Sequence, residues 1–330
     1  MKADLRTPPS RTTVERIAKK LGTKAEEAIP EIENRLRKSE ISPMKTRSIV
    51  IGLDRTSVPM EELRDEGKTP KTRRKTRLKP YVRKRPKPVD VNHRMAYVGT
   101  VSHVDKDGEV IHTKKYYSNA STPPIDLVIR MILDVRQAKN SAQRYLHVAV
   151  IQDGAVELWN LLRTALESEK GVDHWHEAID RYHLAERLGK CLAEVEKDQK
   201  KRRVLFNEWS QNLDNDDSAI DEIEVWLKNE VKTLTGDAKS TLKDTVTYIR
   251  LNKEKMRYFG LRKLGLPVGS GPTEGACKSL VGRRAKSSGQ RWHNLGLDSV
   301  MALRQIHQSE RFDGFWPMFQ QEFGGEILSI

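Results

Sequence analysis

The order of apolar patterns along this chain limits the folds that it can adopt. Residues 46–54 and 145–152 are apolar runs that predict buried strands, and each leads directly into an acid, Asp54 or Asp153. Two further runs, 94–104 and 109–117, lie on either side of Asp105-Lys106-Asp107-Gly108, which predicts a hairpin. The chain therefore begins its core with strands rather than with a helical bundle.

Helical patterns separate and follow these strands. Residues 124–139 and 155–168 have the apolar spacing of helices that cross between strands, and a short apolar segment before Asp180 is a further candidate strand. From 184 to 258 the spacing is helical almost throughout, and Glu274 then opens a helix after the turn Gly269-Ser270-Gly271-Pro272. This order predicts an α/β fold, a mixed sheet flanked by helices and interrupted by an all-helical insertion. The expected regions are a helical N-terminal region at 1–45, a first part of the core at 46–170, a mainly helical insertion at 171–265 and a C-terminal part of the core at 266–330.

Residues 10–38 are expected to form two short helices. The first has a capping residue in Ser10, apolar residues at Val14, Ile17 and Leu21, and a closing glycine at Gly22. This pattern suits one helix of a helix-turn-helix that reads DNA. An ordinary amphipathic helix docked on the next region is the alternative.

The charge of the chain points to a polyanionic partner. Lysine and arginine exceed the acids, so that the net charge is +14 over 330 residues, and the excess is clustered. The stretch from Lys68 to Pro88 holds eleven lysines or arginines, four prolines and no acid, so residues 67–88 are expected to be an extended basic loop lying along DNA phosphates. A solvated loop is the alternative. Its candidate contacts are Arg73, Arg74, Lys75, Arg83, Lys84 and Arg85.

Several other classes of protein are not expected. No apolar stretch is as long as the roughly 20 residues of a spanning helix, and the N-terminus shows no apolar signal-peptide core. With only Cys191 and Cys277, the chain has no disulfide framework, so we expect a cytoplasmic protein with no membrane partner. The histidines His174 and His176 lack the paired spacing of a zinc site.

Three acids, Asp54, Asp153 and Glu274, form the candidate catalytic set. Two of them follow strands and the third lies in the first turn of a helix, positions that can bring acids from distant segments to one place. Carboxylates are the ligands that Mg²⁺ prefers, and two such ions stabilise both the attacking and the leaving oxygen in phosphodiester cleavage. The alternatives are an acid at a strand-ending turn, a surface acid, and an acid that answers a helix dipole.

Other candidates lie near these acids in sequence. His183, three residues after Asp180, is a candidate for phosphate contact or proton transfer, although a buried structural histidine is the alternative. A basic segment follows Glu274, in which a cation can clamp phosphate and Trp292 can either stack on a base or pack on the core. An i,i+4 ion pair with Glu274 is the alternative role of Lys278. The candidates in this segment are Lys278, Arg284, Lys286, Arg291 and Trp292.

The same segment carries a family resemblance. The motif Gly269-Ser270-Gly271-x-x-Glu274-x-x-x-Lys278, followed by Arg284-x-Lys286-x-Ser288-Gly289-x-Arg291-Trp292, resembles the C-terminal signature of bacterial insertion-sequence transposases of the Kra type. The strands that lead to Asp54 and Asp153, and the block Asp180-Arg181-Tyr182-His183-Leu184, are similar to other parts of that family. The resemblance covers roughly residues 45–310.

The resemblance implies a DDE enzyme with an RNase-H-like catalytic fold. Asp54, Asp153 and Glu274 would then be the catalytic, metal-binding triad, which holds two Mg²⁺ ions for which Mn²⁺ can substitute. His183 would sit near the site. The implied partner is double-stranded DNA, both element ends and target, with no small-molecule substrate, and the enzyme would act as a homo-oligomer because two ends must be joined.

Two departures from the family qualify these expectations. Arg55 stands where related proteins have a glycine after the first aspartate, which weakens the assignment of Asp54. The region before the core is short for the family, so a partial N-terminal DNA-binding region is expected. The predicted function is DNA transposition. The alternatives are an RNase-H-like nuclease without strand transfer and a catalytically inactive transposase remnant that only binds DNA.

Overall fold

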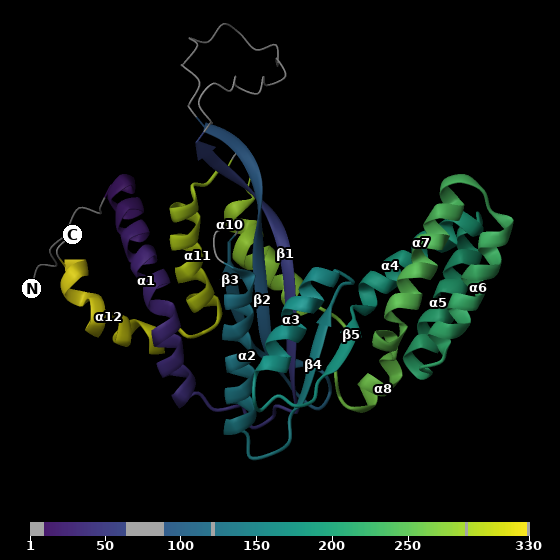
Figure 1. Ribbon diagram of the computed structural model, residues 1–330, viewed down its shortest axis with the longest axis horizontal. Helices are drawn as coiled ribbons and strands as arrows, with labels where there is room; N and C mark the ends of the chain where they lie inside the picture. Colours follow the sequence, from purple (N-terminus) through teal and green to yellow (C-terminus); the bar gives the residue numbers. More distant parts are fainter. Residues whose placement is uncertain (1–9, 64–88, 120–122, 288–289, 329–330) are drawn as a thin grey trace, which may run out of the picture.

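A computed structural model describes residues 10–63, 89–119, 123–287 and 290–328, and its centre is a mixed sheet of five strands (Figure 1). The strands lie in the order β3-β2-β1-β4-β5. They are β1 (Ser48–Leu63), β2 (Val89–Val104), β3 (Val110–Ser118), β4 (His147–Gln152) and β5 (His176–Ile179). The strands β1, β2 and β3 pair antiparallel, whereas β4 pairs parallel with β1, and β5 pairs parallel with β4. The α/β class and the mixed sheet are therefore confirmed.

Helices surround the sheet and extend to both sides of it. Before and between the strands lie α1 (Arg11–Ser39), α2 (Pro124–Ser141) and α3 (Val156–Ser168). The helices after β5 are α4 (Arg181–Val195), α5 (Gln199–Asn215), α6 (Ala219–Thr233), α7 (Gly236–Asn252), the 3₁₀ turn η1 (Lys253–Met256) and α8 (Tyr258–Lys263). The last segments are α9 (Gly271–Ala276), the π-helix η2 (Cys277–Gly282), α10 (Arg283–Ala285), α11 (Asn294–Gln308) and α12 (Phe312–Leu328). None of the helices in the described ranges is long and apolar enough to cross a membrane.

The two faces of the sheet are covered by different helices. Leu127 and Met131 of α2 lie against Gly99 of β2, and this face continues into the largest apolar core. On the opposite face Thr273 of α9 lies against Gly52 of β1, and residues of η2 and α11 join the strands in a second core. Because paired residues of neighbouring strands point to the same face, Asp54 and its partner Val98 lie on the α9 face.

Strand β1 is longer than its sequence pattern indicates. It was expected to end at Asp54, but it continues to Leu63 as a two-stranded ribbon with β2 (Figure 1). Trp292 supports this ribbon from the side: its backbone N–H donates to Pro59 O at 3.3 Å and its carbonyl accepts from Glu61 N at 2.7 Å. Asp54 therefore lies within a strand, and β1 pairs with β2 both before and after it. The segment 67–88 lies outside the described residues.

The candidate strand before Asp180 is present. Residues 176–179, within the region expected to be mainly helical, form strand β5 and pair with β4 at the edge of the sheet. The helices that follow, α4 to α8, occupy residues 181–263 and project to one side of the sheet (Figure 1). Trp209 and Trp226 meet edge to face inside this bundle at 5.0 Å between ring centroids.

The N-terminal region is one helix, so the prediction of two short helices is wrong. Ser10 caps it as expected, and Thr13 N donates to the Ser10 hydroxyl at 3.2 Å, but the helix runs without a break to Ser39. Gly22 does not end it: a Cβ there would lie 2.2 Å from Ser299 O, so the glycine lets α1 approach α11. Because α1 is continuous over residues 11–39, no turn divides this region into the two helices of a helix-turn-helix. The region matches instead the alternative of an amphipathic helix docked on the rest of the protein.

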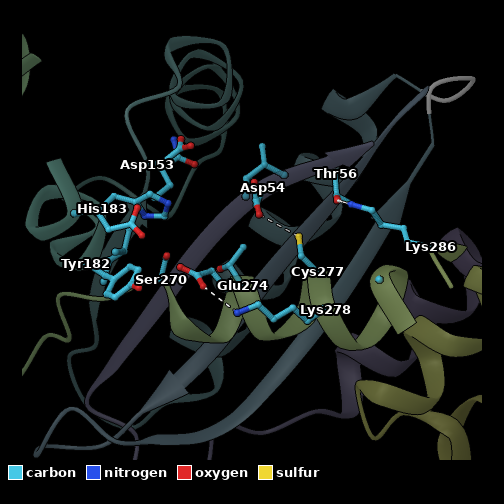
Figure 2. A pocket seen from close by; sticks show the side chains of 16 residues that line it. Asp54, Thr56, Asp153, Tyr182, His183, Ser270, Glu274, Cys277, Lys278 and Lys286 are labelled. Carbon is cyan, nitrogen blue, oxygen red and sulfur yellow. Dashed lines mark hydrogen bonds and ion pairs between the residues drawn. The ribbon is translucent and has the colours of Figure 1, made fainter. Parts of the chain in front are cut away.

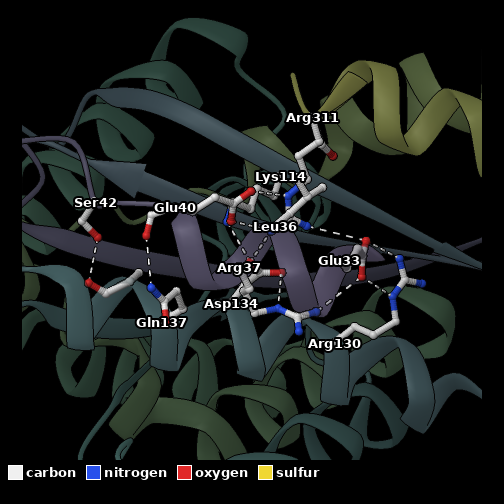
Figure 3. A network of polar contacts seen from close by, with 12 residues as sticks. Glu33, Leu36, Arg37, Glu40, Ser42, Lys114, Arg130, Asp134, Gln137 and Arg311 are labelled. Atoms are coloured by element: carbon white, nitrogen blue, oxygen red, sulfur yellow. Dashed lines mark hydrogen bonds and ion pairs between the residues drawn. The ribbon is translucent and has the colours of Figure 1, made fainter. Parts of the chain in front are cut away.

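A buried ionic network fixes α1 to the rest of the protein (Figure 3). At its centre Asp134 of α2 has no exposed side-chain area and accepts from Lys114 Nζ at 2.7 Å and from the Arg311 guanidinium. Arg311 also holds Glu40 through two hydrogen bonds of 2.8 Å. The remaining members, Glu33 and Arg37 of α1 and Arg130 of α2, close the network. Three carboxylates and four cations thus join α1, α2, β3 and the residue that precedes α12.

Candidate functional site

The three predicted acids line one pocket of about 430 Å³ (Figure 2). Asp54 comes from β1, Asp153 from the loop after β4, and Glu274 from α9. The pocket therefore lies on the α9 face of the sheet, beside the insertion. All three are partly exposed. Other lining residues come from the start of α4 and from the segment α9–η2–α10; they include Tyr182, His183, Glu186, Ser270, Cys277, Lys278 and Lys286.

Asp54 is oriented by two hydrogen bonds. Its Oδ1 accepts from Arg55 N at 2.6 Å, and its Oδ2 accepts from the thiol of Cys277 at 3.2 Å (Figure 2). Burial, and next the Asp54 carboxylate, raise the pKa of the Cys277 thiol, so the sulfur stays protonated at neutral pH and can serve as this donor. The Asp54 carboxylate thus enters the pocket from the middle of strand β1, whose paired backbone is a rigid support.

Arg55 does not enter the pocket, although it replaces an expected glycine. Its guanidinium pairs with Glu157 of α3, to which the Tyr97 hydroxyl also donates at 2.8 Å. Successive side chains of a strand point to opposite faces, so the cation that follows Asp54 is directed away from the α9 face. Arg55 therefore does not cover the side of Asp54 that lines the pocket.

Asp153 is held by the turn between β4 and α3. Its Oδ1 accepts from Ala155 N at 2.9 Å, and its carbonyl accepts from Trp159 Nε1 at 2.8 Å. Gly154 lies directly against the ring of Tyr248 from the insertion helix α7, and the Arg187 guanidinium of α4 covers that ring at 4.1 Å from its centroid. Burial raises the pKa of Tyr248 to about 12. The insertion is thus packed against the turn that carries Asp153.

Glu274 lies in the first turn of α9. The cap is Ser270, and its carbonyl accepts from Glu274 N at 3.1 Å. Glu274 Oε2 lies 3.5 Å from Lys278 Nζ, which is the i,i+4 ion pair named as the alternative role of Lys278. That pair is exposed, with 78% of the Lys278 side chain accessible, so it is weak and open to exchange with a ligand.

The π-helix after α9 affects which side chains reach the pocket. Glu274, Lys278, Gly282 and Lys286 are spaced by four residues and all line it. In a regular α-helix three such steps would rotate Lys286 by about 120° away from Glu274. The wider turns of η2 reduce this drift. The Lys286 ammonium consequently reaches across to the Thr56 hydroxyl of β1 at 2.6 Å.

Gly52 permits the close approach of α9 to the sheet. A Cβ at this position would lie 1.9 Å from Thr273 Oγ1, and the Thr273 hydroxyl bonds that of Thr100 at 2.7 Å. We expect Gly52→Ala to displace α9 and to destabilise the protein by about 1–3 kcal/mol, the usual cost of overpacking. Urea unfolding would measure this loss.

The matched control for that substitution is Gly275→Ala. Gly275 lies on α9 itself and is exposed, and a Cβ added there would meet nothing within 4 Å, so alanine is expected to stabilise the helix slightly. Equal stability of Gly52→Ala and the unaltered protein would show that α9 is free to move away from the sheet.

Within the described part of the chain, one group of three ligand-type side chains has its atoms within 4.8 Å of one another: Asp180, His183 and Glu274. Asp54 and Asp153 line the same pocket but are not members of such a group. The structure thus brings the three predicted acids to one pocket without gathering their oxygens around a single point. His183 belongs to this group as well as to the pocket lining, and its Nδ1 is buried without a hydrogen bond.

The other predicted contact residues divide into two sets. His183, Lys278 and Lys286 line the pocket. Arg284, Arg291 and Trp292 lie beside the β1–β2 ribbon instead: the Arg284 guanidinium covers the Trp292 ring at 4.7 Å, and Arg291 is 4.0 Å from Glu61. Trp292 packs against the second core, as its alternative role required. The basic residues Arg73, Arg74, Lys75, Arg83, Lys84 and Arg85 lie outside the described residues.

Two residues of the site were not singled out from the sequence. Cys277 was considered only for its redox state, although its spacing of three from Glu274 places both on one side of a helix. Asp180 was noted as the end of a candidate strand, as a neighbour of His183 and in the family block, but was not named as a site residue, and it proves to be buried. Its signal in the sequence was its place at the end of a strand and the start of a helix, where an aspartate serves as a cap.

In comparisons with known proteins, the chain matches no protein-family model, and a search of curated proteins finds no match.

Proposed function

We propose that this chain is a DNA transposase of the DDE type, which cleaves DNA at the ends of a mobile element and joins those ends to target DNA. The observation that carries the proposal is the meeting of Asp54, Asp153 and Glu274 in one pocket, although they come from segments far apart in the chain. The family resemblance independently implies these same three residues as the metal-binding triad. The net charge of +14 adds support, since DNA binding is driven by phosphate neutralisation.

The arrangement of the core also supports an RNase-H-like fold. Three antiparallel strands are followed by two parallel ones, helices cover both faces, and the insertion separates the sheet from the helix that carries Glu274. In such sheets functional groups gather at strand ends and at points where neighbouring connections diverge. Asp153 follows β4, and Asp54 lies on the adjacent strand β1.

The residues of the pocket fit Mg²⁺ by their chemistry. All three acids offer carboxylate oxygens and all are partly exposed, whereas the one thiol, Cys277, is kept protonated by its raised pKa. Asp54, Asp153 and Glu274 would hold the metal, which when bound supplies charge stabilisation at the attacking and leaving oxygens of a phosphodiester. The ion pair of Glu274 with Lys278 would exchange for the metal at small cost because it is exposed.

The remaining side chains would bind and orient the DNA backbone. Lys278 and Lys286 are exposed cations at the pocket, suited to phosphate oxygens beside the scissile bond. His183 offers an imidazole on the side formed by the insertion. Holding the phosphate and the attacking group in line accounts for much of the rate of such reactions. Arg284, which covers the Trp292 ring, adds a further cation beside the ribbon.

Supercoiled plasmid carrying an element end tests the proposal. With Mg²⁺ the purified protein is expected to nick the plasmid and then to join a labelled 3′ end to target DNA, and chelation of the metal should stop both reactions. Nicking without joining would favour the RNase-H-like nuclease instead. Salt-sensitive DNA binding without any nicking would refute an active enzyme and favour a DNA-binding remnant.

A further inference from the structure

Asp180 occupies the point where the sheet, the insertion and the helix of Glu274 meet. It follows β5 directly, its side chain is 1% exposed, and it caps α4 by accepting from Tyr182 N at 2.6 Å and from His183 N at 3.3 Å. Its other carboxylate oxygen accepts from Ser270 N at 2.8 Å and from the Ser270 hydroxyl. Residues 181–269, which include the whole insertion, separate Asp180 from Ser270 in sequence.

This bonding decides between two roles for Asp180. Its position near His183 and Glu274 is also that of a possible metal ligand. A carboxylate has about four acceptor positions, however, and the four donors already occupy them. The buried Asp180 carboxylate would have to give up some of these hydrogen bonds in order to bind a cation. Glu274, in contrast, is accessible and would lose only an exposed ion pair. Asp180 is therefore not placed as a ligand.

The hydrogen bonds of Asp180 lead to both neighbouring acids. Its backbone N–H donates to Gln152 O at 2.9 Å, directly before Asp153. On the other side Ser270, which its carboxylate holds, is the cap of α9, and Ser270 O accepts from Glu274 N at 3.1 Å. A parallel bond from Arg181 N to Val268 O at 2.9 Å closes the base of the insertion.

We infer that Asp180 is a positioning residue: by clamping Ser270 to the end of β5 it holds the first turn of α9, and with it Glu274, at the pocket opposite Asp153. The inference rests on the proposed function for its catalytic consequence, but the clamp itself is a property of the protein alone. It also gives the insertion a defined role, because movement of its base would shift Glu274 relative to the sheet.

Hydrogen–deuterium exchange of the full chain, without metal or DNA, tests the clamp directly. In Asp180→Asn the amides of Thr273 and Glu274 are expected to exchange about tenfold faster, since a hydrogen bond to a charged group is lost at the helix start. The matched control is Asp198→Asn, which neutralises the aspartate cap of α5 in the same insertion. Asp198 accepts from Lys200 N and Lys201 N, and neither bond involves α9. Unchanged exchange at α9 in Asp180→Asn would overturn the clamp.

Magnesium dependence of nicking tests the positioning of Glu274. Asp180→Asn is expected to raise the Mg²⁺ concentration for half-maximal nicking about tenfold, with much of the rate restored at saturating metal, as for a ligand that is present but misplaced. Glu274→Gln, which removes the ligand, should show no such recovery. Faster exchange with unaltered Mg²⁺ dependence would overturn the positioning role and leave a purely structural clamp.

A second variant is available at Ser270, the partner of Asp180. Should Asp180→Asn fail to fold, Ser270→Ala replaces it: this variant loses the hydroxyl donor but keeps the backbone donor, and a smaller increase in α9 exchange is expected. Absence of nicking by the unaltered protein would count against the proposed function alone, because the exchange measurements would still support or overturn the bond between Asp180 and Ser270.

Discussion

Asp153→Asn is expected to abolish both plasmid nicking and end joining while leaving salt-sensitive DNA binding intact. The substitution keeps the size of the side chain and the acceptor that Ala155 N uses, but it removes the negative charge that a divalent metal requires. Metal stabilisation of the reacting oxygens is worth several kcal/mol, so the rate should fall by about 10³-fold or more. Asp54→Asn and Glu274→Gln are expected to behave alike, since all three acids line the same pocket.

A turn acid elsewhere in the chain provides the control. Asp105 accepts from Asp107 N and Glu109 N at 2.9 Å in the β2–β3 turn, so Asp105→Asn makes the same chemical change in a similar turn away from the pocket. It should retain full nicking. Plasmid nicking gives the rates, and filter binding over a range of salt shows whether DNA affinity is preserved. Full cleavage by Asp153→Asn would remove this residue from the site.

Much of the core could be predicted from the sequence because its strands are buried on both faces. The runs before Asp54 and Asp153 are continuous in apolar residues, as central strands are, and the structure has strands at both. The apolar pattern did not predict the part of β1 that extends beyond the core. Beyond Asp54, β1 continues as a ribbon whose polar residues, such as Thr56 and Ser57, reflect its partial exposure, so no apolar pattern marked it.

Other features depended on partners distant in sequence. Gly22 has the usual signature of a helix end, yet it lies inside α1 because Ser299 of α11 leaves no room for a side chain. The meeting of three acids was predicted from their places after strands and at a helix start, and the family resemblance implied the same set. In contrast, no spacing within the sequence indicates that Ser270 bonds to Asp180 across the whole insertion. Local patterns therefore predicted elements, whereas the contacts that position the site came from tertiary structure.

The second large effect is expected at the buried network rather than at the pocket. Asp134→Asn should lower the free energy of unfolding by about 3–5 kcal/mol, because it leaves Lys114, Arg37 and Arg311 facing a neutral amide where no water can replace the lost charge. Urea unfolding would measure the loss. Asp126→Asn is the control: this acid lies on the same helix, is exposed, and should cost no more than about 1 kcal/mol.

A double-mutant cycle separates the charge pair from packing. If Asp134 and Lys114 stabilise each other, Asp134→Asn combined with Lys114→Met should cost less than the sum of the single changes, by about 0.5–3 kcal/mol. Strict additivity, or a loss below about 1 kcal/mol for Asp134→Asn alone, would mean that Glu33 and Glu40 suffice to hold the cations.

The same network predicts how stability depends on pH. Burial opposes ionisation of Asp134, but Arg311, Lys114 and Arg37 outweigh it and hold its pKa well below the usual 3.8, and the pKa of Glu40 is likewise lowered from 4.5. A lowered folded-state pKa means that the unfolded chain binds protons first, so this stability is complete above about pH 4.5 and is lost as the pH falls further. Asp134→Asn should flatten that acid dependence. Since the network holds α1 to α2 and β3, acid should release α1 from the body of the protein, which hydrogen–deuterium exchange of the α1 amides would detect.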